Sequence, residues 1–279
     1  MQKIIIPTDF SDLSNYGLSL AVKVADHTPS ELHLLHVINL PSHILLNNDG
    51  ELMEDGEMDI SIPRKQKEDA LLKLEAIKSQ TKHTVSYCVC FGHVNEEVVK
   101  YAEKTEADLI VMGTHGATGI KELINGSHAE YVAMHAQAPV FSLKCDRSDM
   151  EIKSLVLAGS FKEDDVPHCE MVVNLQHAFN AKLHLLRINT KDNFISDSEA
   201  ITHMKTFAAK HNLSNVEFAV YNDNDVEEGI IHYAAKENID VIAIGSMQRT
   251  GLNKFIHGCV SADLVNHVFK PLLTFKLKN

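Results

Sequence analysis

The sequence is poor in positive charge and has no long apolar run, and each absence excludes a class of protein. Lys and Arg number 26 against 38 Asp and Glu, which gives a formal net charge of −12 at pH 7. A broad surface for nucleic acid or for an anionic membrane needs the opposite balance. No run approaches the ~18 apolar residues of a membrane-spanning helix, and the first apolar run ends after three residues at Pro7, unlike a signal peptide. We expect a cytoplasmic protein with no nucleic-acid or membrane partner.

Cysteine is scarce and shows no metal-binding spacing. The five cysteines are Cys88, Cys90, Cys145, Cys169 and Cys259, and none of their separations is typical of a zinc site. The "CVC" stretch lies in an apparent strand, which points Cys88 and Cys90 to one face. Because cysteine packs as a small hydrophobe, we favour buried, reduced thiols. Redox sensing is the alternative.

An internal repeat is the strongest feature that is present. "KIIIPTDFSD" at 3–12 is similar to "SLVLAGSFKE" at 154–163, and "ELHLLHVI" at 31–38 to "KLHLLRIN" at 182–189. "ADLIVMGTHG" at 107–116 and "APVFSLK" at 138–144 return as "IDVIAIGSMQ" at 239–248 and "KPLLTFK" at 270–276. The order is the same in both copies, and each copy has the usual size of a domain. We predict two domains, residues 1–146 and 150–279.

Short β-branched runs alternate with helical periodicity inside each copy. Five apolar runs of the first copy, at 3–7, 32–37, 85–90, 108–113 and 139–144, are continuous rather than alternating. Such strands are buried on both faces, as in parallel sheets covered by helices. Leu13, Gly17, Leu20 and Val24 follow a helical spacing, with Ser11 or Asp12 as the N-cap. The pattern predicts two doubly wound α/β domains, each with a five-stranded parallel sheet.

Two predicted strand ends in the first copy carry residues that suit a nucleotide. Asp9 follows the first strand, and Gly113 and Gly116 follow the fourth. Glycines permit positive φ and close approach of a ligand to the backbone. Gly126-Ser127 then precedes a predicted helix, whose N-terminal N–H groups favour phosphate. Asp9 is an acceptor for ribose hydroxyls or an adenine amino group, so the pattern indicates a nucleotide site at the carboxyl edge of the sheet.

The full pattern resembles the nucleotide motif of the universal stress protein family, in its tandem form with two domains in one chain. The motif, G-x2-G-x9-G-(S/T), is complete here from Gly113 to Ser127. The resemblance implies an adenine nucleotide alpha hydrolase-like fold and an adenine nucleotide, either ATP or AMP or ADP, with or without Mg²⁺. It implies a site made of Pro7, Thr8, Asp9, the backbone of Val37, Met112, Gly113, His115, Gly116, Gly126, Ser127 and His128. At His128 the family often has a small apolar residue followed by a hydroxyl, so one phosphate contact is missing here.

The second copy keeps the outline of the motif but loses its chemistry. Ser160 stands in the place of Asp9, Gln248 replaces the second glycine and Cys259 replaces the hydroxyl residue. A glutamine side chain occupies the place where backbone approach is needed. We interpret this half as a nucleotide-free scaffold or a site for something else. A weakened nucleotide site is the alternative.

Two further segments bear on partners. The acidic segment from Pro41 to Pro63 has no counterpart in the second copy and contains no Lys or Arg. It is interpreted as a solvated loop or short acidic helix, with a lid or a partner-binding segment as the alternative.

The fifth strands, at 139–144 and 271–276, are apolar edges that invite pairing. By the resemblance they pair with each other as an intrachain pseudo-dimer, and a homodimer or an unknown protein partner is also possible.

Three functions remain open at the level of sequence. The first is a nucleotide-binding stress or regulatory protein that holds ATP in its N-terminal half. The second is a slow ATPase or a nucleotidyl or phosphoryl transferase, which the missing G-x-x-x-x-G-K-[ST] loop and the lack of carboxylates beyond Asp9 disfavour. The third is a scaffold that uses no nucleotide. No catalytic residue is predicted.

Overall fold

Ten strands form one continuous sheet in the computed structural model. It describes residues 2–40, 44, 46–47, 50–53, 60–114, 128–146, 149–162, 169–246 and 269–276. The first copy contributes β1 (Lys3–Pro7), α1 (Asp12–His27), β2 (Glu31–Ile38), α2 (Ser61–Gln80), β3 (Val85–Phe91), α3 (Val94–Lys104), β4 (Leu109–Gly113), α4 (His128–His135) and β5 (Val140–Leu143). The second contributes β6 (Ser154–Ala158), α5 (Glu170–Phe179), β7 (Lys182–Asn189), α6 (Asp197–Lys210), β8 (Val216–Asn222), α7 (Val226–Lys236), β9 (Val241–Ser246) and β10 (Leu272–Lys276).

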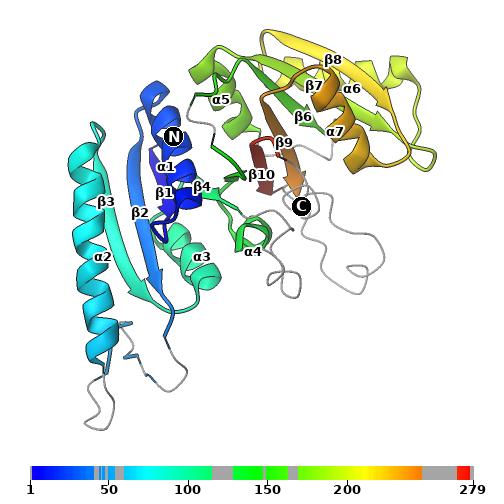
Figure 1. The fold of residues 1–279 in the computed structure, drawn as a ribbon. Helices are drawn as coiled ribbons and strands as arrows, with labels where there is room; N and C mark the ends of the chain where they lie inside the picture. The colour runs from blue at the N-terminus through cyan, green and yellow to red at the C-terminus, as the bar shows by residue number, and fades with distance from the viewer. Residues whose placement is uncertain are drawn as a thin grey trace.

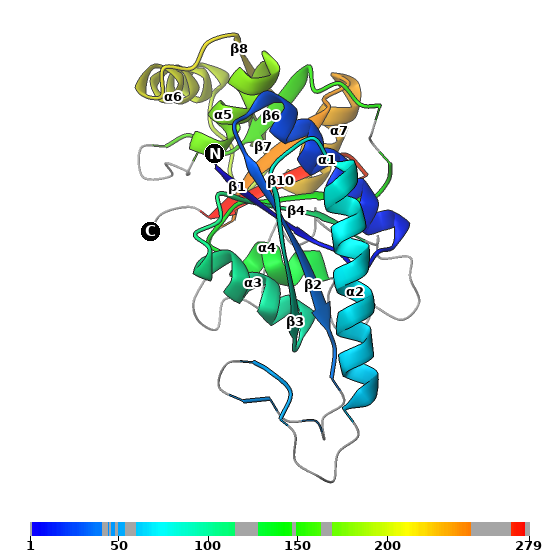
Figure 2. The same ribbon diagram turned by 90° about the vertical axis from the view of Figure 1, so that its left-hand side faces the viewer.

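The strand order confirms two doubly wound sheets. It is β3-β2-β1-β4-β5-β10-β9-β6-β7-β8, and every pair is parallel except β5 with β10. The middle residues of the central strands β1, β4, β6 and β9 are apolar and buried because helices cover both faces of the sheet. Figure 2 shows α1 and α2 on one side of the first half and α3 and α4 on the other. Ser11 is the N-cap of α1, and its side chain accepts a hydrogen bond from the Ser14 N–H. No described helix is long and apolar enough to cross a membrane.

The two halves join through the antiparallel pairing of β5 with β10 (Figure 1). Phe141 lies opposite Leu273, and both side chains are fully buried. The helices support the same join, since His27 at the end of α1 meets Phe179 at the end of α5, with 4.6 Å between ring centroids. A single buried apolar cluster runs from Ile4 in the first half to Phe275 in the second. The predicted intrachain pseudo-dimer is therefore confirmed.

Lysines at the ends of the two central strands lie in related surroundings. The Lys276 ammonium, at the end of β10, donates to the His135 carbonyl at the end of α4, with an Nζ–O distance of 3.0 Å. A cation at a helix C-terminus also complements the helix dipole. Lys144, its counterpart after β5, lies over the Phe269 ring with its Nζ 5.5 Å from the centroid. Burial lowers the pKa of Lys144 to about 8 and lowers that of Lys276.

Helix α1 approaches β4 so closely that only glycine fits at the contact. A Cβ on Gly113 would lie 2.1 Å from the Leu13 carbonyl oxygen, and a Cβ on Gly17 would lie 2.9 Å from the Gly113 nitrogen. Both neighbours are backbone atoms that cannot turn aside. Gly113 does not have a positive φ, so its backbone conformation does not by itself require glycine. The glycine is explained by helix–strand packing, and this packing fixes α1 beside the end of β4.

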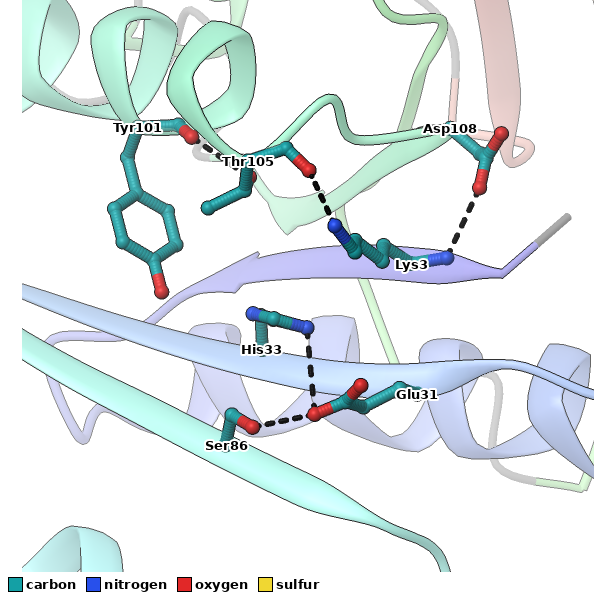
Figure 3. A network of polar contacts seen from close by, with 7 residues as sticks. All are labelled: Lys3, Glu31, His33, Ser86, Tyr101, Thr105 and Asp108. Atoms are coloured by element: carbon teal, nitrogen blue, oxygen red, sulfur yellow. Dashed lines mark hydrogen bonds and ion pairs between the residues drawn. The ribbon is translucent and has the colours of Figure 1, made fainter.

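The opposite, amino edge of the sheet is tied together by an aspartate in each copy, and Figure 3 shows the contact of Asp108 with Lys3 in the first. Asp108 accepts from the Gln2 and Lys3 N–H groups at 2.7 and 3.0 Å. Asp240 accepts from the Lys153 and Ser154 N–H groups, both at 2.9 Å. Each aspartate precedes a fourth strand and ties it to the start of the first. This edge therefore has a structural role that recurs in both halves.

The four cysteines in the described residues are free thiols. Cys88 and Cys90 both pack against the cluster beneath α3 and α4, so the predicted common face is confirmed. Burial raises the pKa of Cys90 to about 12 and that of Cys169 to about 11. Raised pKa values keep the thiols protonated, which disfavours the redox-sensing alternative for these two positions.

We expect Gly113→Ala to destabilise the fold by about 3 kcal/mol, because the new methyl group has no room beside the α1 backbone. Gly159→Ala is the matched control, since its Cβ would meet only ring atoms of Phe161, the nearest at 3.7 Å. Urea unfolding followed by circular dichroism measures both. Equal stability of the two variants would contradict the packing explanation.

We expect Lys276→Met to cost about 1 kcal/mol of folding free energy, because the variant loses the hydrogen bond to the His135 carbonyl and keeps most of the apolar stem. Lys153→Met is the control, because Lys153 is highly exposed and its ammonium pairs with the equally exposed side chain of Glu151. Thermal denaturation compares the two. If Lys153→Met lowers the melting temperature as much as Lys276→Met does, the contact between Lys276 and the His135 carbonyl does not stabilise the joining of the two halves.

Candidate functional site

The first half has its topological switch point between β1 and β4. From β1 the chain builds outward through β2 and β3, and it then returns to the other side of β1 with β4 and β5. The connections after β1 and β4 therefore leave the sheet in opposite directions. A crevice opens at the carboxyl edge between such connections, and it is where open α/β sheets bind ligands.

Asp9 stands at this edge as an exposed, ionised carboxylate. Its Oδ1 accepts from the Ser11 N–H at 3.0 Å and from the Ser11 hydroxyl at 2.5 Å. Partial desolvation by the loop raises the pKa of Asp9, but the hydrogen bonds from Ser11 and Ser14 together outweigh it, and the pKa lies below its usual value. Asp9 is thus a fixed hydrogen-bond acceptor at neutral pH.

The neighbouring residues hold this loop in an unusual conformation. Phe10 has φ 66°, in the left-handed region that bulky residues rarely adopt. His36 on β2 stabilises it, since its ring lies 4.6 Å from the Phe10 ring and its Nδ1 bonds the Thr8 carbonyl at 2.7 Å. Sequence reasoning missed both residues. The available signal was the repeat itself, because Phe161 occupies the same place in the second copy and has φ 57°.

Val37 presents its backbone to the crevice. The last rung between β1 and β2 is the bond from the Thr8 N–H to the Leu35 carbonyl, at 2.8 Å. Alternate residues of a strand direct their N–H and C=O groups to the same side. Val37 lies two residues after Leu35, so its polar groups point past the end of β1. Its side chain packs under α3, which leaves the backbone as the part that faces a ligand.

Met112 and Gly113 complete the opposite wall at the end of β4. Met112 is buried and packs against the cluster beneath α3 and α4. Gly113 pairs with Leu143 of β5 and contacts α1. Pro7, Thr8, Asp9, Val37, Met112 and Gly113 therefore share one edge of the sheet. His115, Gly116, Gly126 and Ser127 lie outside the described residues.

His128 begins α4, the crossover helix between the parallel strands β4 and β5. Such a helix starts at the carboxyl edge, so its first turn lies on the crevice side of the sheet. The side chain is exposed, and its Nδ1 bonds the Asn95 side chain at the start of α3. The helix N-terminus directs N–H groups toward this edge, an arrangement that favours anions. Asn95 is a neighbour of the site that the sequence pattern did not reveal.

The corresponding edge of the second half differs in its polar groups. Ser160, in the place of Asp9, is half-buried, and its hydroxyl accepts from the Lys162 N–H at 3.4 Å. Arg187 takes the place of His36 and donates to the Asn193 carbonyl at 2.6 Å. The described residues that follow β6, 159–162, include no carboxylate. Gln248, Gly258 and Cys259 lie outside the described part of the chain.

Comparisons with known proteins agree with the fold and the repeat. The model of the universal stress protein family matches residues 1–144 and again 153–276. Two curated relatives from Methanocaldococcus jannaschii are universal stress proteins MJ0531 and MJ0577, and each is 32% identical to this chain in the aligned region. The alignments cover 51% of this chain, 82% of MJ0531 and 94% of MJ0577. A solved universal stress protein from Archaeoglobus fulgidus superposes with a TM-score of 0.75 at 19% identity and covers 98% of both chains. The chain belongs to the universal stress protein family, with two copies of the family's domain in tandem.

Proposed function

We propose that the N-terminal half binds one adenine nucleotide, ATP in the first place, and that the protein acts as a nucleotide-binding stress or regulatory protein. The observation that supports this proposal is that Asp9, Val37 and the start of α4 all lie at the carboxyl edge of the first parallel sheet, beside its switch point. Asp9 accepts from ribose hydroxyls, and Val37 offers a backbone donor and acceptor to the edge of adenine. The α4 N-terminus and the motif Gly113 to Ser127 suit the phosphates.

The second half serves in this proposal as a scaffold or a surface for a partner. Its Ser160 replaces the carboxylate, and its motif lacks the second glycine and the hydroxyl residue. In this proposal the nucleotide regulates the protein by binding one of two conformations more tightly, because a ligand shifts a conformational equilibrium only by the difference in its affinity for the two states. Slow hydrolysis of ATP is the second candidate activity. Asp9 is the only carboxylate among the residues of the proposed site, and its Oδ1 already accepts two hydrogen bonds from Ser11. This disfavours Asp9 as a general base.

We expect Asp9→Ser, which copies the second half, to weaken ATP binding about tenfold, because a hydrogen bond to a charged acceptor is worth about 1.5–3 kcal/mol. Asp12→Ser is the matched control, because Asp12 is exposed in the first turn of α1 and its substitution removes the same charge. Isothermal titration calorimetry with ATP, ADP and AMP measures all three proteins. Unchanged affinity in Asp9→Ser would overturn the assignment of Asp9.

We expect the purified protein, when denatured, to release about one adenine nucleotide per chain, because only one half has the complete motif. Mass spectrometry identifies the nucleotide, and absorbance quantifies it. Two nucleotides per chain would show that the second half also binds. If the protein releases none and binds none at millimolar concentration, the proposal fails and the scaffold function replaces it. Recovery of ADP from ATP-loaded protein would establish hydrolysis.

A further inference from the structure

The second half contains a cavity of about 470 Å³ that the proposed function does not use. It is lined by Phe161 and Lys162 from the segment after β6, and by Glu199, His203 and Thr206 from α6. The three α6 residues are spaced four and three apart, so they form one face of the helix. This volume lies within the range of small-molecule sites. The cavity lies between the segment that follows β6 and the side of α6 that carries these three residues.

Part of the cavity lining is aromatic. Phe161 is only 6% exposed, and its ring packs edge-on against Phe207 with 5.2 Å between centroids. In the first half the corresponding ring is covered differently: the Lys73 ammonium lies 4.9 Å from the Phe10 centroid and His36 packs on it. In the second half Met204 corresponds to Leu74, since each is fully buried and lies four residues after a buried alanine, Ala200 or Ala70. His203, which lines the cavity, therefore stands where the first half has Lys73.

Two opposite charges face the cavity without neutralising each other. Lys162 and Glu199 are both exposed, and neither forms an ion pair with any residue that the structure describes. They come from separate walls, the strand end and the first turn of α6. An ammonium on one wall and a carboxylate on the other match a ligand that itself carries both charges.

His203 also lines the cavity. Its Nδ1 is buried beneath the cavity surface and has no hydrogen-bond partner among the described residues, so the imidazole ring rather than this atom is what the cavity presents. The flat imidazole also offers a second surface on which an aromatic ring can pack.

We propose that this cavity binds an aromatic amino acid in its zwitterionic form. Lys162 pairs with the ligand carboxylate, Glu199 with the ligand ammonium, and the ligand ring packs between Phe161 and His203. The volume holds one amino acid of the largest kind together with water. The cavity lies in the second half and the nucleotide site in the first, so we expect neither ligand to change the affinity of the other.

The test uses L-tryptophan as the probe, since the chain contains no Trp and the fluorescence reports the ligand alone. The full-length protein is titrated into L-tryptophan with excitation that avoids tyrosine. A saturable blue shift of the emission is expected, because the indole leaves water. N-acetyl-L-tryptophanamide, which has the ring but neither charge, is expected to give no saturable shift. Binding of both compounds with equal affinity would overturn the zwitterion assignment.

Three variants locate the site. Lys162→Met and Glu199→Gln are each expected to weaken L-tryptophan binding roughly tenfold, the effect of losing one charge-assisted hydrogen bond. Lys205→Met, at an exposed α6 position that does not line the cavity, is the control and is expected to bind as the wild type does. Circular dichroism establishes that each variant is folded. No saturable binding by the wild type at millimolar probe, or equal binding by all three variants, would overturn the proposal.

Competition separates this inference from the nucleotide proposal. Addition of saturating ATP is expected to leave the L-tryptophan affinity unchanged, because the two sites lie in different halves. Displacement of the probe by ATP would show that the cavity is a nucleotide site and would overturn the assignment to an amino acid. Failure of ATP binding in the first half leaves the L-tryptophan result untouched, so the two proposals fail separately.

Discussion

The antiparallel pairing of β5 with β10 is the constraint on which the arrangement of the whole chain depends. Each half ends in an apolar strand whose outer edge would otherwise expose unpaired N–H and C=O groups. Pairing Phe141 with Leu273 satisfies both edges at once and merges two five-stranded sheets into one. Packing between α1 and α5 and the Lys276 contact with α4 then follow from that geometry. The core is consequently continuous across the two halves.

A second constraint sets the shape of the candidate site. The contact between α1 and Gly113 holds the start of α1 against the end of β4, which places Asp9 beside the switch point. His36 fixes the intervening loop through the Thr8 carbonyl and the Phe10 ring. The same glycine that the motif assigns to a ligand therefore has a structural reason of its own. A motif residue can serve packing and recognition together.

The sequence predicted the fold well because the repeat and the continuous apolar strands are strong signals. The five strands and the α1 N-cap of the first half lie where the periodicity places them. The site was predicted only in part. Asp9 and Val37 could be placed because they follow strands, whereas His36 and Asn95 act through contacts with residues distant in sequence. The conformation of Phe10 was also beyond reach, since no local pattern predicts a left-handed phenylalanine.

Because the two halves are joined in one chain, they can carry different residues at equivalent positions, which the two subunits of a homodimer cannot. In a homodimer every substitution appears twice, so neither subunit can lose a carboxylate that the other retains. Here one half has Asp9 at its first strand end and the other has Ser160, while Asp108 and Asp240 keep the same structural task in both. Because both halves belong to one chain, this inequality is permanent. Each molecule carries the two unlike halves in a fixed one-to-one ratio, whatever its concentration.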